Sequence, residues 1–241
     1  MKKAITFFVV VVVWYVASLF SNPIFIPSPL SVVDAFIQTI QSGMLVKAFG
    51  YSFARITIAS VLSAATAIPI AVAVKHYKNL NETIKPLLDS LRYVPVTAFY
   101  PLLIMWFGIG ESMKIAFLFF ATFIYMLPSA VIIFNDVNQN LIDTGKTIGM
   151  SDLQIITKVV LPASAPSIAQ TFLMMYGIGW TYIAIAETTN AKYGLGFTIA
   201  VSSARGQTNL VFMAIITIML ASVLFDKAGK WIIERCFKWK Q

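Results

Sequence analysis

The chain has few of the side chains that catalyse reactions or bind metals, and they are far apart in the sequence. Its 241 residues include one histidine, one cysteine and ten acidic residues. His76 stands in a basic segment with no identifiable partner, and Cys236 alone can form neither an intramolecular disulfide nor a cysteine-rich metal site. Almost all of the acids fall outside the apolar runs, where an intramembrane enzyme would need paired Asp or a Ser with His. We therefore expect no catalytic residue, no metal and no cofactor held by this chain.

A polar stretch, Asp143 to Pro162, separates two long apolar runs and has the signals of two short helices. The residues from about Asn138 onward predict the first helix, which Gly149 ends as a left-handed C-terminal cap. Ser151, followed three residues later by Gln154, predicts a capping box at the start of the second helix. These signals predict a compact polar module in a loop of an otherwise apolar chain.

The second helix of this module has an apolar face. Pro162 predicts that the helix ends at Leu161, because a proline disfavours helical backbone in the residue before it. The resulting length of about 15 Å is too short to cross a bilayer. The face consists of Leu153, Ile156, Val159 and Val160. Periodicity alone leaves two roles open: a helix that rests on lipid or on its own bundle, or one that docks on a partner.

Two charged residues, Arg55 and Glu187, fall near the predicted outer ends of apolar runs. Charges at membrane depth are costly and often functional, but long side chains near an interface can also reach water. Arg55 could attract an anion, whereas Glu187 would oppose one. A role in the solute pathway, a structural ion pair that braces an outer gate, and snorkelling all remain open.

Polar and aromatic residues on two of the apolar runs could line a passage through the membrane. They are Thr97, Tyr100, Trp106, Tyr176, Trp180 and Thr181. Buried Trp and Tyr side chains also serve as packing, so each of these residues has a structural alternative.

Membrane-spanning helices must position all of these residues. The chain is 59% hydrophobic and 12% charged, and its apolar runs approach the roughly 20 residues that a spanning helix needs. The runs are continuous rather than alternating, which predicts an all-α, six-span bundle instead of a barrel. We treat residues 1–241 as one domain with a cytoplasmic loop at 135–166. The predicted spans cover residues 4–20, 53–74, 94–107, 115–134, 168–186 and 210–225.

The basic residues predict the orientation of the bundle. Six spans place both termini on one side, and basic residues near span ends accumulate in the cytoplasm. Thirteen of the 18 Lys and Arg residues fall on the side of the termini, namely Lys2, Lys3, Lys75, Lys78, Lys85, Arg92, Lys146, Lys158, Lys227, Lys230, Arg235, Lys238 and Lys240. The other five are Lys47, Arg55, Lys114, Lys192 and Arg205. The formal charge of +8 is scattered over separate loops, so it predicts cytoplasmic termini rather than nucleic-acid binding.

The module also has a longer pattern, in which Gly149 is followed after nine residues by Val159 and, after one more, by Leu161-Pro162. This spacing resembles the cytoplasmic loop signature of binding-protein-dependent ABC importer permeases, in which Glu-Ala-Ala, three residues and Gly precede the nine-residue interval. Here Asp143-Thr144-Gly145 replaces Glu-Ala-Ala. The acid is kept, but Gly145 weakens the helix by about 1 kcal/mol relative to Ala.

Further segments narrow the resemblance to the permeases for nitrate, sulfonates, taurine and pyrimidine thiamine precursors. They occur in family order and read "IPSPLSVVDAF", "SFARITIA", "RYVPVTAFYPLLIMWFGIGESMKI" and "AETTNAKYGLGFTI". The resemblance implies a type I importer permease in the prokaryotic inner membrane. The chain has no GxxxxGK[ST] phosphate loop, so ATP and Mg would be bound by a partner ATPase subunit.

The resemblance implies that the module is a coupling helix region that docks into a groove of the ATP-binding subunit. Gly149 would be a geometric requirement, and Leu153 and Ile156 would be the apolar anchors. The predicted coupling residues are Asp143, Gly149, Ser151, Asp152, Leu153, Ile156, Leu161 and Pro162.

The resemblance further implies the partners: a second permease copy, identical in the simplest arrangement, two ATP-binding subunits and an external solute-binding protein. The leading solutes are small anions such as sulfonates, taurine or nitrate. A thiamine-type pyrimidine precursor or another heterocycle is the alternative solute. A secondary transporter is the rival class, and it would need inverted repeats and midplane charges that this sequence does not show.

Overall fold

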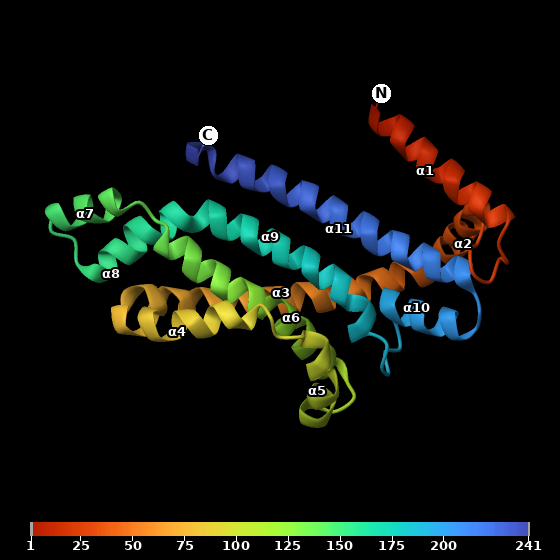
Figure 1. The fold of residues 1–241 in the computed structure, drawn as a ribbon, viewed down its shortest axis with the longest axis horizontal. Helices are drawn as coiled ribbons and strands as arrows, with labels where there is room; N and C mark the ends of the chain where they lie inside the picture. Colours follow the sequence, from red (N-terminus) through yellow and green to blue (C-terminus); the bar gives the residue numbers. More distant parts are fainter. Residues whose placement is uncertain (1, 241) are drawn as a thin grey trace. The chain divides into compact units, whose positions relative to one another are not determined.

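The computed structural model describes residues 2–240 as helices joined by short connections, and no strand occurs among these residues (Figure 1). The predicted all-α class is therefore confirmed. The chain divides into two units. Unit 1 is formed by residues 1–54 and 183–221, and unit 2 by residues 55–182 and 222–241.

Four helices in the described part of the chain are long and apolar enough to cross a membrane. They are Met44–His76 (α3), Glu111–Asn135 (α6), Asp152–Ala186 (α8 to α9) and Thr208–Cys236 (α11). These helices contain the predicted spans at 53–74, 115–134, 168–186 and 210–225. The predicted spans at 4–20 and 94–107 fall on shorter apolar helices, Ile5–Leu19 and Val96–Phe107. The number of six spans stays a prediction.

Unit 1 contains α1 (Lys2–Leu19), α2 (Pro29–Gln41), the start of α3, α10 (Leu195–Ala204) and the start of α11. The helix α2 begins at Ser28, whose hydroxyl accepts a hydrogen bond from the Ser31 N–H at 3.2 Å. The helix α10 follows Gly194, whose φ of 146° favours glycine. Both short helices therefore start at a residue suited to the turn.

Unit 2 contains the rest of α3, most of α9 (Leu161–Ala186) and the end of α11. It also contains α6 and the shorter elements α4 (Lys78–Leu91), η1 (Val96–Phe99), α5 (Tyr100–Phe107), α7 (Gln139–Thr147), α8 (Asp152–Ile155) and η3 (Lys238–Lys240). The π-helical turn η2 (Ile156–Val160) joins α8 to α9. The core of unit 2 combines small residues of α3 with large residues of α6. The buried members include Ala67, Ala71, Val74, Met126 and Phe134. Small side chains let helix backbones approach closely, as is common between membrane helices.

The helix that begins after Ser151 does not end before Pro162, which corrects the sequence prediction. It continues through η2 and α9 to Ala186. In η2 the Leu161 N–H donates to the Ile156 carbonyl, five residues back instead of four. This wider turn precedes the proline, whose ring would otherwise press on the carbonyl four residues earlier. The module is consequently continuous with a long apolar helix.

Candidate functional site

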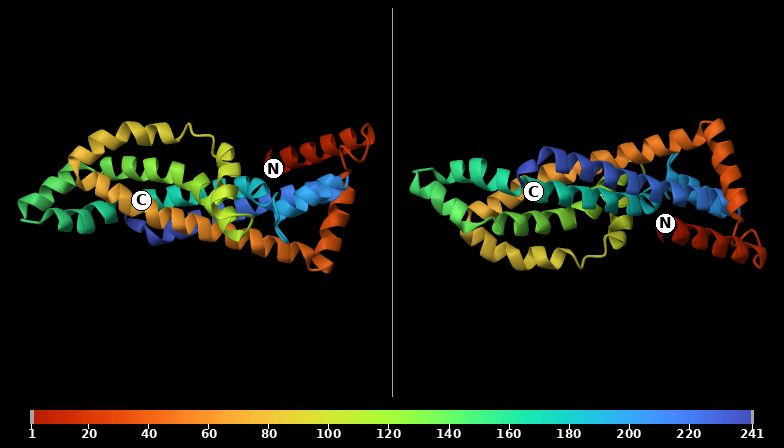
Figure 2. Two further views of the ribbon diagram at one scale, coloured as in Figure 1. Left: turned by 90° about the horizontal axis from the view of Figure 1, so that it is seen from below. Right: turned by 90° about the horizontal axis from the view of Figure 1, so that it is seen from above.

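The module between α6 and α9 is a tight helical hairpin at one end of unit 2 (Figures 1 and 2). The first helix, α7, ends at Gly149, where φ is 78°. The Met150 N–H donates to the Gly145 carbonyl and the Gly149 N–H to the Lys146 carbonyl, both at 3.0 Å. This pair of bonds is a Schellman motif, so the predicted left-handed cap at Gly149 is confirmed.

The start of the second helix is fixed by the predicted capping box. The Ser151 hydroxyl accepts from the Gln154 N–H at 3.4 Å, and the Ser151 N–H donates to Gln154 Oε1 at 2.9 Å. Asp143, on α7, accepts from the Gln139 amide at 2.9 Å. Because both ends of the turn are bonded, the hairpin is a defined body rather than a loose loop.

Buried residues of the hairpin join it to the core of unit 2. Ile142, Ile155 and Val160 belong to the same apolar cluster as Val74 of α3 and Phe134 of α6. A displacement of the hairpin would therefore be passed to two long helices through packed side chains.

Gly145 lies on the inner side of the hairpin, where a methyl group would make ordinary van der Waals contact with the second arm. A Cβ at this position would lie 3.4 Å from the Met150 sulfur and 3.5 Å from Ile155 Cγ1. The departure from the family's Ala at this position therefore falls inside the packed hairpin, not on its exposed surface.

Apolar side chains remain exposed on the outside of the hairpin. Leu153 is 69% exposed, whereas Ile156 is only 8% exposed and packs inside. Leu141 and Ile148 of α7 and its cap are also exposed. Of the two predicted anchors, Leu153 is thus the accessible one. We call Leu141, Ile148 and Leu153 the hairpin face.

The other predicted coupling residues also differ in their exposure to solvent. Asp143, Gly149, Ser151, Asp152 and Pro162 are exposed, while Leu161 is half-buried at the start of α9. Their contact with a partner stays a prediction.

Arg55 is buried, and its partner in unit 2 is a carboxylate at the start of α6. Arg55 Nε lies 2.6 Å from Glu111 Oε2, and Nη2 lies 2.7 Å from Oε1, a bidentate pair. Lys114, also buried, donates to Glu111 Oε1 at 3.1 Å and to the Gly110 carbonyl at 3.3 Å. The Glu111 side chain itself is 56% exposed. The accessible Glu111 carboxylate therefore forms ion pairs with two buried cations, Arg55 and Lys114.

Glu187 is buried in unit 1 at the start of α10. Its carboxylate oxygens each lie 2.9 Å from the Ser52 hydroxyl, and Oε2 accepts from the Gly196 N–H at 2.8 Å. The Ser52 oxygen in turn accepts from the Leu195 N–H at 2.9 Å. A Cβ on Gly194 would overlap the carboxylate. The segment Gly194-Leu195-Gly196 thus leaves room for the Glu187 carboxylate and donates a hydrogen bond to it. The predicted pairing of Arg55 with Glu187 stays a prediction.

The pathway candidates on α9 differ in burial. Tyr176 is buried and hydrogen-bonded to the Thr57 hydroxyl at 3.0 Å, and Trp180 is buried with its ring stacked on Phe225. Thr181 is exposed, and its hydroxyl donates to its own helix at the Ile178 carbonyl.

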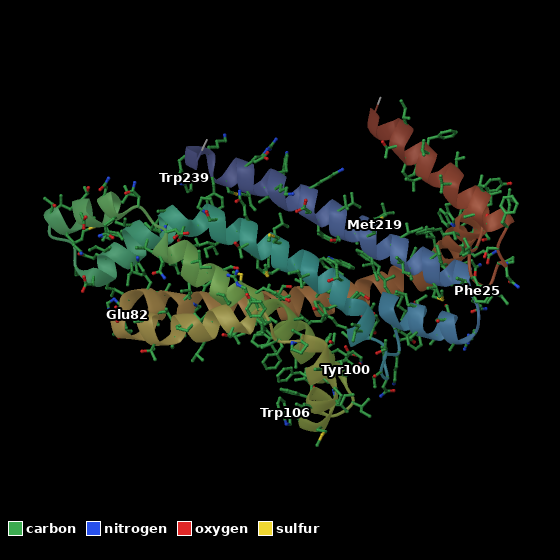
Figure 3. The ribbon with its side chains drawn as sticks, viewed as in Figure 1. Phe25, Glu82, Tyr100, Trp106, Met219 and Trp239 are labelled. Carbon is green, nitrogen blue, oxygen red and sulfur yellow. The ribbon has the colours of Figure 1, made fainter. Side chains whose placement is uncertain are left out.

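The candidates on η1 and α5 face more open surroundings. Tyr100 lies edge-on to Phe117, and Trp106 is largely exposed at the other end of α5 (Figure 3). Thr97 on η1 is exposed. Tyr176 and Trp180 are packed, while Thr97 and Trp106 are accessible from outside unit 2.

Sequence reasoning missed the partners of the buried charges. Glu111 and Lys114 are three residues apart at the start of a span, a spacing that places both on one helix face and is visible in the sequence. Ser52, one turn before Arg55, gives no such signal.

A model of the family described as "Binding-protein-dependent transport system inner membrane component" matches residues 65–238. The chain is 29% identical over 237 residues to a putative ABC transporter permease protein of Methanocaldococcus jannaschii, with 96% of this chain and 89% of the relative covered. It is 28% identical to the taurine transport system permease protein TauC of Escherichia coli, with 94% and 84% covered. Against the putative aliphatic sulfonates transport permease protein SsuC of Bacillus subtilis the identity is 29%, with 89% and 78% covered.

Among solved structures, a chain of the MetNI methionine ABC transporter in an inward-facing conformation matches with a TM-score of 0.72 at 17% identity. That match covers 81% of this chain and 97% of the other. An amino acid ABC transporter solved with histidines matches with a TM-score of 0.64 at 11% identity, with 83% and 97% covered. At these identities the likeness concerns the fold.

Proposed function

The chain belongs to the family of binding-protein-dependent transport system inner membrane components, the permeases of ABC importers, and we propose that it moves a small anion delivered by an external binding protein. It is a membrane protein with the type I importer fold and is not itself an enzyme. The proposed solutes are sulfonates, taurine or nitrate.

Two relatives support a solute with an anionic sulfonate group, since their names specify taurine and aliphatic sulfonates. A thiamine-type pyrimidine is the alternative. A ligand screen on the purified solute-binding protein of this system would separate the two classes. An arginine-lined site that prefers sulfonates would support the anion, and preference for a planar heterocycle would favour the alternative.

One observation carries the coupling role: a rigid hairpin with an exposed apolar face shares its core with two long helices. We propose that the ATP-binding subunit docks on the hairpin face and that its closure moves α3 and α6 through Ile142, Ile155 and Val160. A rigid body transmits displacement, whereas a mobile loop would absorb it.

The proposed assembly follows from this role. Two copies of the permease pair with two ATP-binding subunits in the cytoplasm and one solute-binding protein outside, in a prokaryotic inner membrane. ATP and Mg bind the partner subunits, because this chain has no phosphate-binding loop.

The substitution Leu153→Asp tests the coupling role. It places a charge in an apolar contact, where an unpaired carboxylate is costly, and it leaves every buried residue of the hairpin unchanged. We expect the purified complex to lose its ATP-binding subunit and reconstituted vesicles to lose ATP-driven uptake, while the permease still inserts.

Leu153→Met is the matched control, because it keeps an apolar side chain of similar volume, and it should retain both properties. If Leu153→Asp also retained the subunit and full uptake, the hairpin would be an interfacial element resting on lipid instead.

A further inference from the structure

A groove of about 370 Å³ lies between the hairpin and the C-terminal end of the chain. Its lining includes Leu141, Ile148, Met150, Lys158 and Pro162 from the hairpin and the start of α9. Trp239, from η3, contributes to the lining although it is distant in sequence. Figure 3 shows Trp239 beside the start of α9.

Trp239 is held at the rim of this groove rather than buried in it. It is 66% exposed, and its ring lies 5.2 Å from that of Phe237 in an edge-on arrangement. The Phe237 N–H donates to the Ile233 carbonyl at the end of α11, which fixes the start of the tail. A large aromatic side chain at the edge of a groove is the kind of residue that dominates protein interfaces.

The groove is continuous with the hairpin face. Leu141 and Ile148 are exposed members of the hairpin face that also line the groove, so a partner that covers these two residues also meets the groove. The charge within the lining comes from Lys158, and Lys238 is exposed next to Trp239. The groove therefore suits an apolar side chain that is followed or preceded by an acidic residue.

We propose that this groove receives an apolar side chain, flanked by an acidic residue, from the same ATP-binding subunit that docks on the hairpin face. Trp239 is then a second contact of that interface, supplied by the C-terminal tail. The inference rests on the proposed coupling function. Tryptophan also favours membrane interfaces, so a lipid contact is the competing outcome of the test.

Photocrosslinking tests which molecule covers the groove. The photoreactive residue p-benzoylphenylalanine replaces Trp239 in the complex assembled from the purified permease and its ATP-binding subunit in lipid vesicles. We expect a crosslink from position 239 to the ATP-binding subunit. The same residue at Trp231, which is 54% exposed and lies under the Arg235 guanidinium, should not crosslink to that subunit.

Substitution measures the strength of the contact. Trp239→Ala should weaken binding of the ATP-binding subunit by at least about tenfold, the effect of truncating an aromatic hot-spot residue of an interface. Trp239→Phe and Trp231→Ala should bind within about twofold of the natural chain. Both positions are exposed. Membrane fractionation checks the insertion of each of the three variants, and size-exclusion chromatography checks its monodispersity.

The outcomes separate this inference from the coupling proposal. If Leu153→Asp releases the subunit while Trp239→Ala does not, the groove inference is wrong and the coupling role stands. If position 239 crosslinks to lipid or to a second permease, the groove inference is wrong, and the result of Leu153→Asp alone decides the coupling role. If neither substitution releases the subunit, both are wrong.

Discussion

Single residues decide whether the hairpin can form, and Gly149 is the clearest case. Its φ of 78° lies in the left-handed region, and an added Cβ there would meet no atom within 4 Å. The requirement is therefore conformational and not steric. Gly149→Val should cost roughly 1 to 2 kcal/mol or more, because a β-branched residue resists this backbone.

A matched pair of substitutions isolates that conformational requirement. Gly149→Asn adds a side chain that tolerates the left-handed region, so it should retain most of the uptake and the bound ATP-binding subunit. Gly149→Val should lose most of both. Equal behaviour of the two variants in a vesicle uptake assay would contradict a role for the Schellman turn.

The local residues of the site were predictable, but the distant ones were not. The Gly149 cap and the Ser151 capping box depend on residues within a few positions, so the sequence reveals them. Arg55 and Glu111 are 56 residues apart, and Ser52 and Glu187 are 135 apart. No local pattern specifies such pairs, because chain folding brings them together.

At the scale of elements, the same glycine-to-alanine change should have opposite effects in two helices. In α7, a Cβ on Gly145 makes ordinary contacts at 3.4 Å and beyond, so Gly145→Ala should stabilise the helix by up to about 1 kcal/mol. In α9, a Cβ on Gly179 would lie 2.9 Å from Ile56 Cγ2, so Gly179→Ala should force α3 and α9 apart and destabilise the protein.

Thermal unfolding of the purified variants measures this difference. The melting temperature of Gly145→Ala should equal or exceed that of the natural chain, and that of Gly179→Ala should be lower. A lower value for Gly145→Ala would show that the hairpin arms are packed more tightly than these contacts indicate.

Element boundaries were less predictable than element types. Pro162 was expected to end a helix, yet the π-helical turn η2 accommodates it and the helix continues to Ala186. The rule that a proline ends the preceding helix considers only α-helical backbone, whereas here a π-helical turn, in which Ile156 and Val160 are buried, leads into the proline. The short helices α4 and α10 were also not predicted, since neither has a long apolar run.

At the scale of the whole molecule, the groove bears on topology independently of the charge count. Trp239 lines it together with hairpin residues, so the C-terminus and the hairpin must face the same side of the membrane. The distribution of Lys and Arg predicts that this side is the cytoplasm. Two arguments with different physical origins thus place the end of α11 and the hairpin together.

Cysteine labelling in intact cells tests this orientation. The native Cys236 is exposed near the end of α11, and an impermeant maleimide should reach it only after the membrane is permeabilised. In a Cys236→Ser background, Asp152→Cys should behave in the same way. Gln207→Cys lies between the predicted spans 168–186 and 210–225, on the side opposite the termini, and should react in intact cells. Labelling of position 152 from outside would invert the scheme. Because the hairpin could not then meet a cytoplasmic ATPase, that result would also remove the basis of the coupling role.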